Sequence, residues 1–224
     1  KCFQYTAGSS RSTFLRGRCL VQDQQRIFPM KFIATSVDDS TQKMKSMVQA
    51  ELQRPDYAID QYFYRSHLVY EKELDALIFR SWLYACHIDE LPETGSFQLF
   101  KRTGSPILIV RGKDSVVRAF YNTCRHRGAP LVRECKGRVD GLVCGYHGWT
   151  YGLDGRLMNL RDKRDFVDLD LSKHPLSPVR CERFGNWIFV NEDPDAEPLL
   201  THLGPMPAML EEIQPEQVRF VHRK

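Results

Sequence analysis

The sequence has no apolar run that approaches the roughly 20 residues which a membrane-spanning helix needs. Its seven cysteines are odd in number and irregularly spaced, which argues against a secreted disulfide scaffold and fits a reducing compartment. A broad basic field is also missing, because residues 1–29 hold five basic residues and one acidic residue and so carry the whole net charge of +4. These absences predict a cytoplasmic globular protein that binds neither membrane nor nucleic acid.

Two short segments each pair a cysteine with a histidine. The first reads Cys124-Arg-His126 and the second reads Cys144-Gly-Tyr-His147, with seventeen residues between them. Four thiol and imidazole side chains in two short segments indicate a metal site. Zinc accepts this ligand set, but its sites more often place like ligands together. A mixed pair in each segment suits a two-iron cluster, in which one iron takes both cysteines and the other both histidines.

The neighbouring residues extend this pattern. The runs Cys124-Arg-His-Arg-Gly-Ala-Pro130 and Cys144-Gly-Tyr-His-Gly-Trp-Thr-Tyr151 resemble the two cluster loops of Rieske non-heme iron oxygenases. The resemblance is to the N-terminal half of the α subunit, and it implies a [2Fe-2S] cluster held by Cys124, His126, Cys144 and His147. High-potential Rieske proteins of respiratory chains carry an extra cysteine in each loop. Here Gly145 follows Cys144 and residues 127–130 hold no cysteine, so the loops are similar to the oxygenase type.

The resemblance also implies a function. The chain would be the electron-accepting part of a terminal oxygenase. That oxygenase would hydroxylate or demethylate an aromatic or related organic substrate with O2, as in the catabolism of aromatic hydrocarbons. An NAD(P)H-dependent reductase or a ferredoxin would supply electrons, and the full-length protein would be a homo-oligomer, a trimer. A mononuclear Fe(II) would lie in a following domain. The D/E-x2-H-x4-H segment of that domain finds no match, and His174, His202 and His222 lack its spacing. We therefore expect the chain to stop near a domain boundary.

The pattern of short strands and turns predicts a mainly β fold, a small antiparallel Rieske domain. Strands are expected at 83–90, 97–101, 107–111, 116–121, 179–181 and 187–191, with a hairpin at 150–155. Helices are expected at 39–54, 71–82 and 199–213, with an extended aromatic stretch at 56–70. The predicted segments are a disordered leader or upstream remnant (1–29), a helical segment packing on the Rieske domain (30–90), the Rieske domain (91–195), and a linker with the start of a catalytic domain (196–224).

Two alternatives of other classes stay open. A stand-alone Rieske ferredoxin would only carry electrons, but it would not need the helical segment before its first strand or the tail after residue 198. A zinc module would be colourless and would give no EPR signal on reduction.

Residues around the cluster loops have expected roles. Gly128, Gly145 and Gly148 are expected to allow positive φ, and Tyr146 and Trp149 to cover the cluster or simply to pack. Five basic residues form a possible docking collar for an acidic electron donor, or are only solvated charge: Arg125, Arg127, Arg133, Lys136 and Arg138. His87 is interpreted as a lone histidine without a metal, and Cys86 and Cys181 as buried thiols.

Overall fold

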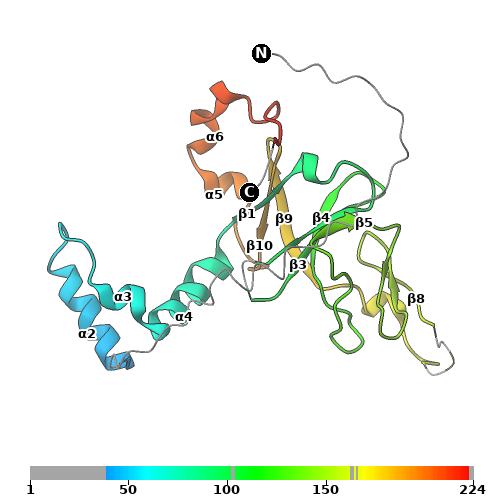
Figure 1. The fold of residues 1–224 in the computed structure, drawn as a ribbon, viewed down its shortest axis with the longest axis horizontal. Helices are drawn as coiled ribbons and strands as arrows, with labels where there is room; N and C mark the ends of the chain where they lie inside the picture. Colours follow the sequence, from blue (N-terminus) through cyan, green and yellow to red (C-terminus); the bar gives the residue numbers. More distant parts are fainter. Residues whose placement is uncertain (1–38, 102–103, 162–163, 165, 222–224) are drawn as a thin grey trace, which may run out of the picture.

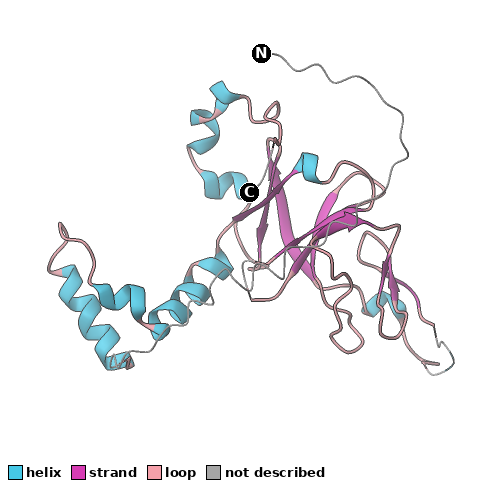
Figure 2. Cartoon of the chain, in the orientation of Figure 1, coloured by secondary structure: helices cyan, strands magenta, loops and turns pink. Residues whose placement is uncertain are grey.

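The computed structural model describes residues 39–101, 104–161, 164 and 166–221 of the chain, so the expected leader at 1–29 lies outside the described residues. Figures 1 and 2 show two antiparallel sheets, one with the strand order β1-β10-β9-β4-β3-β2-β5 and one with the order β6-β7-β8. The large sheet comprises β1 (Leu83–His87), β2 (Ser96–Phe100), β3 (Ile107–Arg111), β4 (Val117–Tyr121), β5 (Lys136–Arg138), β9 (Pro178–Phe184) and β10 (Trp187–Asn191). The small sheet comprises β6 (Leu142–Val143), β7 (Thr150–Tyr151) and β8 (Leu157–Asn159). The predicted mainly β, antiparallel fold is confirmed.

Strand β3 divides the core into two parts. Residues 107–110 are all fully buried, as a continuous apolar run covered on both faces should be. Successive side chains of a strand point to opposite faces. Leu108 and Val110 pack in the cluster that also holds both cysteines of the Cys-His segments, whereas Ile107 and Ile109 pack on the side of β1 and β10. One of the two cores therefore lies directly beneath the candidate metal loops.

The large sheet begins before residue 91, where the sequence placed the start of the Rieske domain. Strand β1 pairs with β10 from Leu83 opposite Val190 to His87 opposite Trp187. Residues 83–87 were predicted to be a strand, but within the preceding helical segment. The pairing makes them an edge of the sheet.

From residue 39 on, the described chain has three helices before the sheet: α2 (Thr41–Leu52), α3 (Gln61–Arg65) and α4 (His67–Ala76), followed by the 3-10 turn η1 (Ile78–Arg80). Helix α2 confirms the prediction for 39–54. The extended stretch predicted at 56–70 is wrong, and the helix predicted at 71–82 is shifted toward the N-terminus. Asp60 and Ser66 are the reason, because their side chains accept hydrogen bonds from the amides of Tyr62 and Val69 and so begin α3 and α4. These caps outweigh the strand preference of the aromatic residues.

The helical segment is joined to the sheet at its C-terminal end. Helix α2 buries no residue, and Figure 1 shows the helices extending away from the strands. At the other end, the indole Nε1 of Trp82 donates to the carbonyl of Glu197 (2.9 Å), and Asn191 Nδ2 donates to the carbonyl of Arg80 (3.1 Å). The guanidinium of Arg180 lies 5.5 Å from the Trp82 ring centroid.

After β10 the predicted helix at 199–213 is divided into α5 (Leu199–Leu203), α6 (Met206–Met209) and the 3-10 turn η5 (Glu211–Ile213). Gly204 takes a φ of 54° and ends α5, so the apolar period alone overestimated the length of the helix. Two further 3-10 turns are η2 (Ile88–Glu90) and η4 (Leu171–Lys173). No helix of the described ranges has the length and apolar composition that crossing a bilayer requires.

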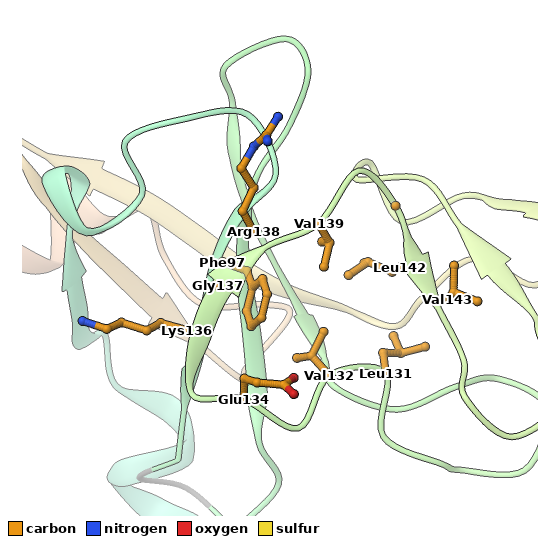
Figure 3. A pocket seen from close by; sticks show the side chains of 11 residues that line it. Phe97, Leu131, Val132, Glu134, Lys136, Gly137, Arg138, Val139, Leu142 and Val143 are labelled. Carbon is orange, nitrogen blue, oxygen red and sulfur yellow. The ribbon is translucent and has the colours of Figure 1, made fainter. Parts of the chain in front are cut away.

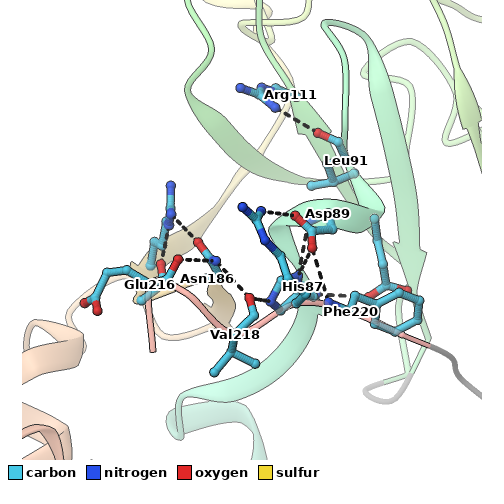
Figure 4. A network of polar contacts seen from close by, with 12 residues as sticks. His87, Asp89, Leu91, Arg111, Asn186, Glu216, Val218 and Phe220 are labelled. Atoms are coloured by element: carbon cyan, nitrogen blue, oxygen red, sulfur yellow. Dashed lines mark hydrogen bonds and ion pairs between the residues drawn. The ribbon is translucent and has the colours of Figure 1, made fainter. Parts of the chain in front are cut away.

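The C-terminal segment returns to the edge of the large sheet, where polar side chains hold it (Figure 4). The buried His87 accepts at Nδ1 from the Asp89 amide (3.2 Å), so its Nε2–H donates to the carbonyl of Val218 (3.1 Å). Asn186 Nδ2 also donates to the Val218 carbonyl (3.0 Å), and the Phe220 amide donates to Asp89 (3.2 Å). His87 thus anchors backbone with both ring nitrogens, in agreement with its interpretation as a histidine without a metal.

Candidate metal centre

The two Cys-His segments fold into loops with the same backbone hydrogen bonds. In each loop the cysteine amide donates to the carbonyl five residues later, and the amide of the glycine four residues later donates back to the cysteine carbonyl. These bonds are Cys124–Ala129 (2.8 Å) and Gly128–Cys124 (3.0 Å) in the first loop, and Cys144–Trp149 (2.8 Å) and Gly148–Cys144 (2.9 Å) in the second. The first loop follows β4, and the second joins β6 to β7. The sequence motif thus corresponds to a duplicated structure.

The glycine that closes each loop needs its conformational freedom. Gly128 has a φ of 73° and Gly148 a φ of 68°, in the left-handed region that other residues rarely adopt. Gly145 is not among the residues with positive φ, so the expectation for it is wrong. Its position directly after Cys144 does not close the turn.

The two cysteine thiols form one buried pair. Cys124 and Cys144 are each 2% exposed, in the apolar core beneath the loops. Burial raises the pKa of the Cys124 thiol, and the neighbouring Cys144 thiol adds to this effect, whereas the Tyr151 hydroxyl opposes it. That hydroxyl lies 3.4 Å from Cys124 Sγ and accepts from the amide of Arg125 at 3.0 Å. A metal deprotonates the thiols that coordinate it, so the raised pKa of Cys124 without a metal does not prevent this residue from acting as a ligand.

The two histidine rings form a second pair at the half-buried ends of the loops. The ring centroids of His126 and His147 are 4.6 Å apart, with an interplanar angle of 66°. Burial lowers the pKa of His126, and electrostatic interaction with His147 and Arg127 lowers it further, which favours the neutral imidazole that a metal binds. Its Nδ1 is buried and has no hydrogen-bond partner among the described residues. An orphaned imidazole nitrogen beside a second imidazole fits a metal.

Aromatic side chains surround the histidine pair unequally. The Trp149 indole stacks on the ring of His126, with centroids 4.9 Å apart and planes within 5°. Phe166 meets both of these rings edge-on, at 5.8 Å each. Tyr146 lies over His147 at 3.8 Å but is 62% exposed. The ring that stacks on His126 is therefore buried, whereas the ring over His147 is largely exposed.

The four side chains do not converge on one point. In the described part of the chain, no group of three or more His, Cys, Asp or Glu side chains is arranged to hold a single ion. Two further cysteines of the described residues belong to the other core: Cys86 is buried in it as predicted, whereas Cys181 packs against it and is half-buried, and burial raises the pKa of Cys181 to about 12. Cys135, to which the sequence assigned no role, is disulfide-bonded. His174 bonds the Asp170 carbonyl through Nδ1 (3.0 Å) and meets Trp149 edge-on.

The basic collar is exposed but partly neutralised by its own surroundings. All five residues of the collar are exposed. Arg138 lies 3.5 Å from a carboxylate oxygen of Glu93 and 3.7 Å from one of Asp140. Arg125 donates to the hydroxyl of Ser177 (3.2 Å). Pairing of this kind weakens the local field, so a docking role of the collar stays a prediction.

A groove of about 300 Å³ lies beside the loops (Figure 3). Its apolar lining comes from Phe97, Leu131, Val132, Val139, Leu142 and Val143. Lys136 and Arg138 of the collar also line it, together with Glu134. Charges of both signs at one groove do not select a partner by charge alone.

Comparison with known proteins agrees with this geometry. Residues 81–197, just over half of the chain, match the family model of the Rieske [2Fe-2S] domain. The chain belongs to the Rieske [2Fe-2S] family. The match begins before β1 and ends after β10, so it includes the whole large sheet and both loops.

Relatives of this Rieske chain are oxygenases. It is 36% identical over 165 residues to the glycine betaine monooxygenase oxygenase subunit of Chromohalobacter salexigens, which covers 72% of this chain and 37% of that protein. It is 32% identical over 149 residues to the 2-aminobenzenesulfonate 2,3-dioxygenase subunit alpha of an Alcaligenes species, covering 65% and 38%. The crystal structure of a quaternary ammonium Rieske monooxygenase with L-carnitine matches at a TM-score of 0.66 and 34% identity, over 71% of this chain and 46% of that one.

These matches confirm the predicted resemblance to the α subunits of Rieske non-heme iron oxygenases. They also show that the chain spans less than half of the length of these relatives. A Rieske [2Fe-2S] cluster is therefore the cofactor of this domain. Zinc, the alternative that the ligand types left open, is not the metal of this family.

Sequence reasoning missed two residues of the centre. Tyr151 was quoted as part of the second motif without a role, although its hydroxyl bonds the first loop. Phe166 lies between β8 and β9, in a segment for which the sequence predicted neither a strand nor a helix. Alternation in β7 could have indicated that Tyr151 points inward, whereas no local signal places Phe166 on the histidine.

Proposed function

We propose that this chain is the electron-accepting Rieske portion of a terminal non-heme iron oxygenase. In this proposal Cys124 and Cys144 hold one iron of the cluster, and His126 and His147 hold the other. The observation that carries the assignment is the separation of the four side chains into a buried thiol pair and a half-buried imidazole pair. Two irons with two ligands each need that separation, whereas one zinc ion needs four ligands around a single point.

The surrounding residues have defined tasks in this centre. A bound Rieske cluster supplies one-electron transfer. The glycine-closed loops hold the ligands at fixed spacing, and the Tyr151 hydroxyl donates a hydrogen bond to the sulfur of Cys124. Such a bond stabilises negative charge on sulfur and so favours the reduced state. The apolar core beneath the thiols, which includes Leu108 and Leu142, excludes water from that side.

The parts of the chain outside the β domain support the oxygenase over a stand-alone ferredoxin. An electron carrier needs only the sheets and the loops, yet this chain adds α2, α3 and α4 in front. It also adds a C-terminal segment that His87 and Asn186 fix to the edge of the large sheet. Fixing that segment would give a following catalytic domain a defined starting point. That domain would hold the mononuclear Fe(II) on a facial triad.

Partners and substrate follow from the relatives. We infer that an NAD(P)H-dependent reductase or a ferredoxin reduces the cluster, and that the full-length protein is a homo-oligomer, with a trimer as the expected form. The names of two of the three relatives described above indicate quaternary ammonium compounds as substrates, and the name of the third indicates an aromatic sulfonate. We therefore propose a quaternary ammonium substrate with N-methyl groups, in place of the aromatic hydrocarbon that the sequence suggested.

The experiment uses the purified chain after reconstitution with iron and sulfide. We expect iron and acid-labile sulfide in the protein, an EPR signal on reduction, and reversible bleaching with NADH and a reductase. We expect no product from carnitine, glycine betaine or naphthalene, because a cluster with four protein ligands leaves no open position for O2. A colourless protein that retains zinc would contradict the assignment. Product formation by this chain alone would contradict the division of labour between two domains.

A further inference from the structure

We propose that Trp149 is the positioning residue for His126: the second loop supplies the aromatic wall that fixes the imidazole of the first loop. This inference rests on the proposed ligand assignment and deepens it. It assigns to Trp149 an action on one named histidine, rather than general packing over the cluster.

The contact between the two rings is specific in its geometry. The Trp149 indole and the His126 imidazole are parallel within 5°, with centroids 4.9 Å apart. Trp149 is 3% exposed, so its own position is fixed by the core beneath the loops. Phe166 touches the edges of both rings at 5.8 Å and encloses the stack from a second direction. A planar contact with these constraints restricts rotation of the imidazole about its χ2 bond.

Among the described residues, ring contacts rather than hydrogen bonds hold the side chain of His126. A histidine ligand is normally oriented by a hydrogen bond from its second ring nitrogen to a carboxylate or carbonyl. Among the described residues, no hydrogen bond to the side chain of His126 is found, and its Nδ1 is buried and orphaned. The stack therefore takes over the orienting task, while Nδ1 stays available for a metal.

The duplicated loops show that this wall is not a by-product of the fold. Trp149 and Ala129 occupy equivalent positions, since each carbonyl accepts from the cysteine amide of its own loop. Ala129 is too small to provide a wall for the other histidine. His147 is instead covered by Tyr146, which is 62% exposed. The same backbone thus places a buried ring against one histidine and an exposed ring against the other.

The test compares four variants of the reconstituted chain: Trp149→Leu, Trp149→Phe, Phe166→Leu and, as the matched control, Tyr146→Leu. The first readout is the rate at which a strong chelator bleaches the oxidised protein. The second is the linewidth of the EPR signal after reduction, which widens when a ligand takes a range of orientations. Loss of an orienting neighbour typically costs about 10–100-fold in metal affinity. We expect Trp149→Leu to bleach about 10-fold faster or more on that scale and to broaden the EPR signal.

The remaining variants distinguish orientation of the His126 ring from simple shielding of the cluster. Trp149→Phe keeps a flat ring and should restore the wild-type linewidth, whereas Tyr146→Leu should leave both readouts near those of the wild type. Equal effects of Trp149→Leu and Tyr146→Leu would overturn the proposal, because they would indicate shielding alone. If Trp149→Leu does not fold, the test depends on Phe166→Leu. A wild-type rate of bleaching by the chelator in that variant overturns the proposal. A complete cluster in His126→Ala would instead refute the ligand assignment.

Discussion

Replacing Tyr151 by phenylalanine removes one oxygen atom from the centre of the site. The hydroxyl lies 3.4 Å from Cys124 Sγ and 3.0 Å from the amide nitrogen of Arg125. Burial raises the pKa of Tyr151, and the hydrogen bond to Cys124 raises it further, so the phenol keeps its proton and can donate to sulfur. The ring itself is fully buried, and phenylalanine fills almost the same space. The substitution therefore tests the hydrogen bond with little change in packing.

The size of the effect follows from the charge on the sulfur. A hydrogen bond to a charged acceptor contributes about 1.5–3 kcal/mol. Only the part that differs between the oxidised and the reduced cluster changes the potential. A difference of about 1 kcal/mol corresponds to about 40 mV, since a one-electron couple shifts by about 59 mV per tenfold change in its equilibrium constant. Reduction adds negative charge, so loss of the donor should lower the potential of Tyr151→Phe by about this amount.

The assay is a redox titration of the reconstituted chain, followed by EPR or visible absorbance. Tyr121→Phe is the matched control, because the hydroxyl of Tyr121 donates to Glu192 (2.9 Å) and its ring packs in the other core. We expect a lower potential for Tyr151→Phe and none or little change for Tyr121→Phe. An unchanged potential in Tyr151→Phe, together with a lower melting temperature, would show that the hydroxyl serves only the Arg125 amide and would refute the electronic role.

Three other changes have defined outcomes. Cys144→Ser should lose iron, sulfide and colour by metal analysis, whereas Cys181→Ala should keep them, because burial raises the pKa of that thiol to about 12 and makes it inert. Reduction by an acidic donor should slow as salt shortens the Debye length from about 10 Å at 0.1 M to about 3 Å at 1 M, and a constant rate would count against the collar. Asn186→Ala should lower the free energy of unfolding by about 1–3 kcal/mol in denaturant titrations, because the carbonyl of Glu216 loses its side-chain donor and that of Val218 keeps only His87. A wild-type value would mean that the C-terminal segment does not depend on this side chain.

The sequence predicted the elements whose signals are local. The β-branched run at 107–111 and the alternation at 187–191 both became strands within a residue of the expected bounds. The Gly-x-x-Gly turn at 152–155 joins β7 to β8 as expected of a hairpin. The Cys-His spacing also predicted two short loops, because such close ligands leave no room for regular structure between them. In these cases the residues that decide the structure lie within one turn of each other.

The misses come from competition between local signals and from contacts over long sequence distances. At 56–70 the aromatic residues indicated an extended chain, but the caps at Asp60 and Ser66 decided for helices. At 199–213 the apolar periodicity predicted one continuous helix, but Gly204 ends α5. The stack of Trp149 on His126 joins residues of different loops, and its existence depends on how the sheets place those loops side by side. Spacing along the chain carries no information about that placement.

The loop geometry also explains how mixed Cys-His pairs would form the proposed site for two irons. Each loop closes where the cysteine amide meets the carbonyl five residues on, so the cysteine lies at the base and the histidine near the tip. Two such loops side by side bring base to base and tip to tip. The bases are 2% exposed and sit in an apolar core, whereas the tips are half-buried. The two thiols thereby form one pair and the two imidazoles another, although the members of each pair come from different loops. A single zinc ion needs the opposite arrangement, in which all four ligands converge on one point.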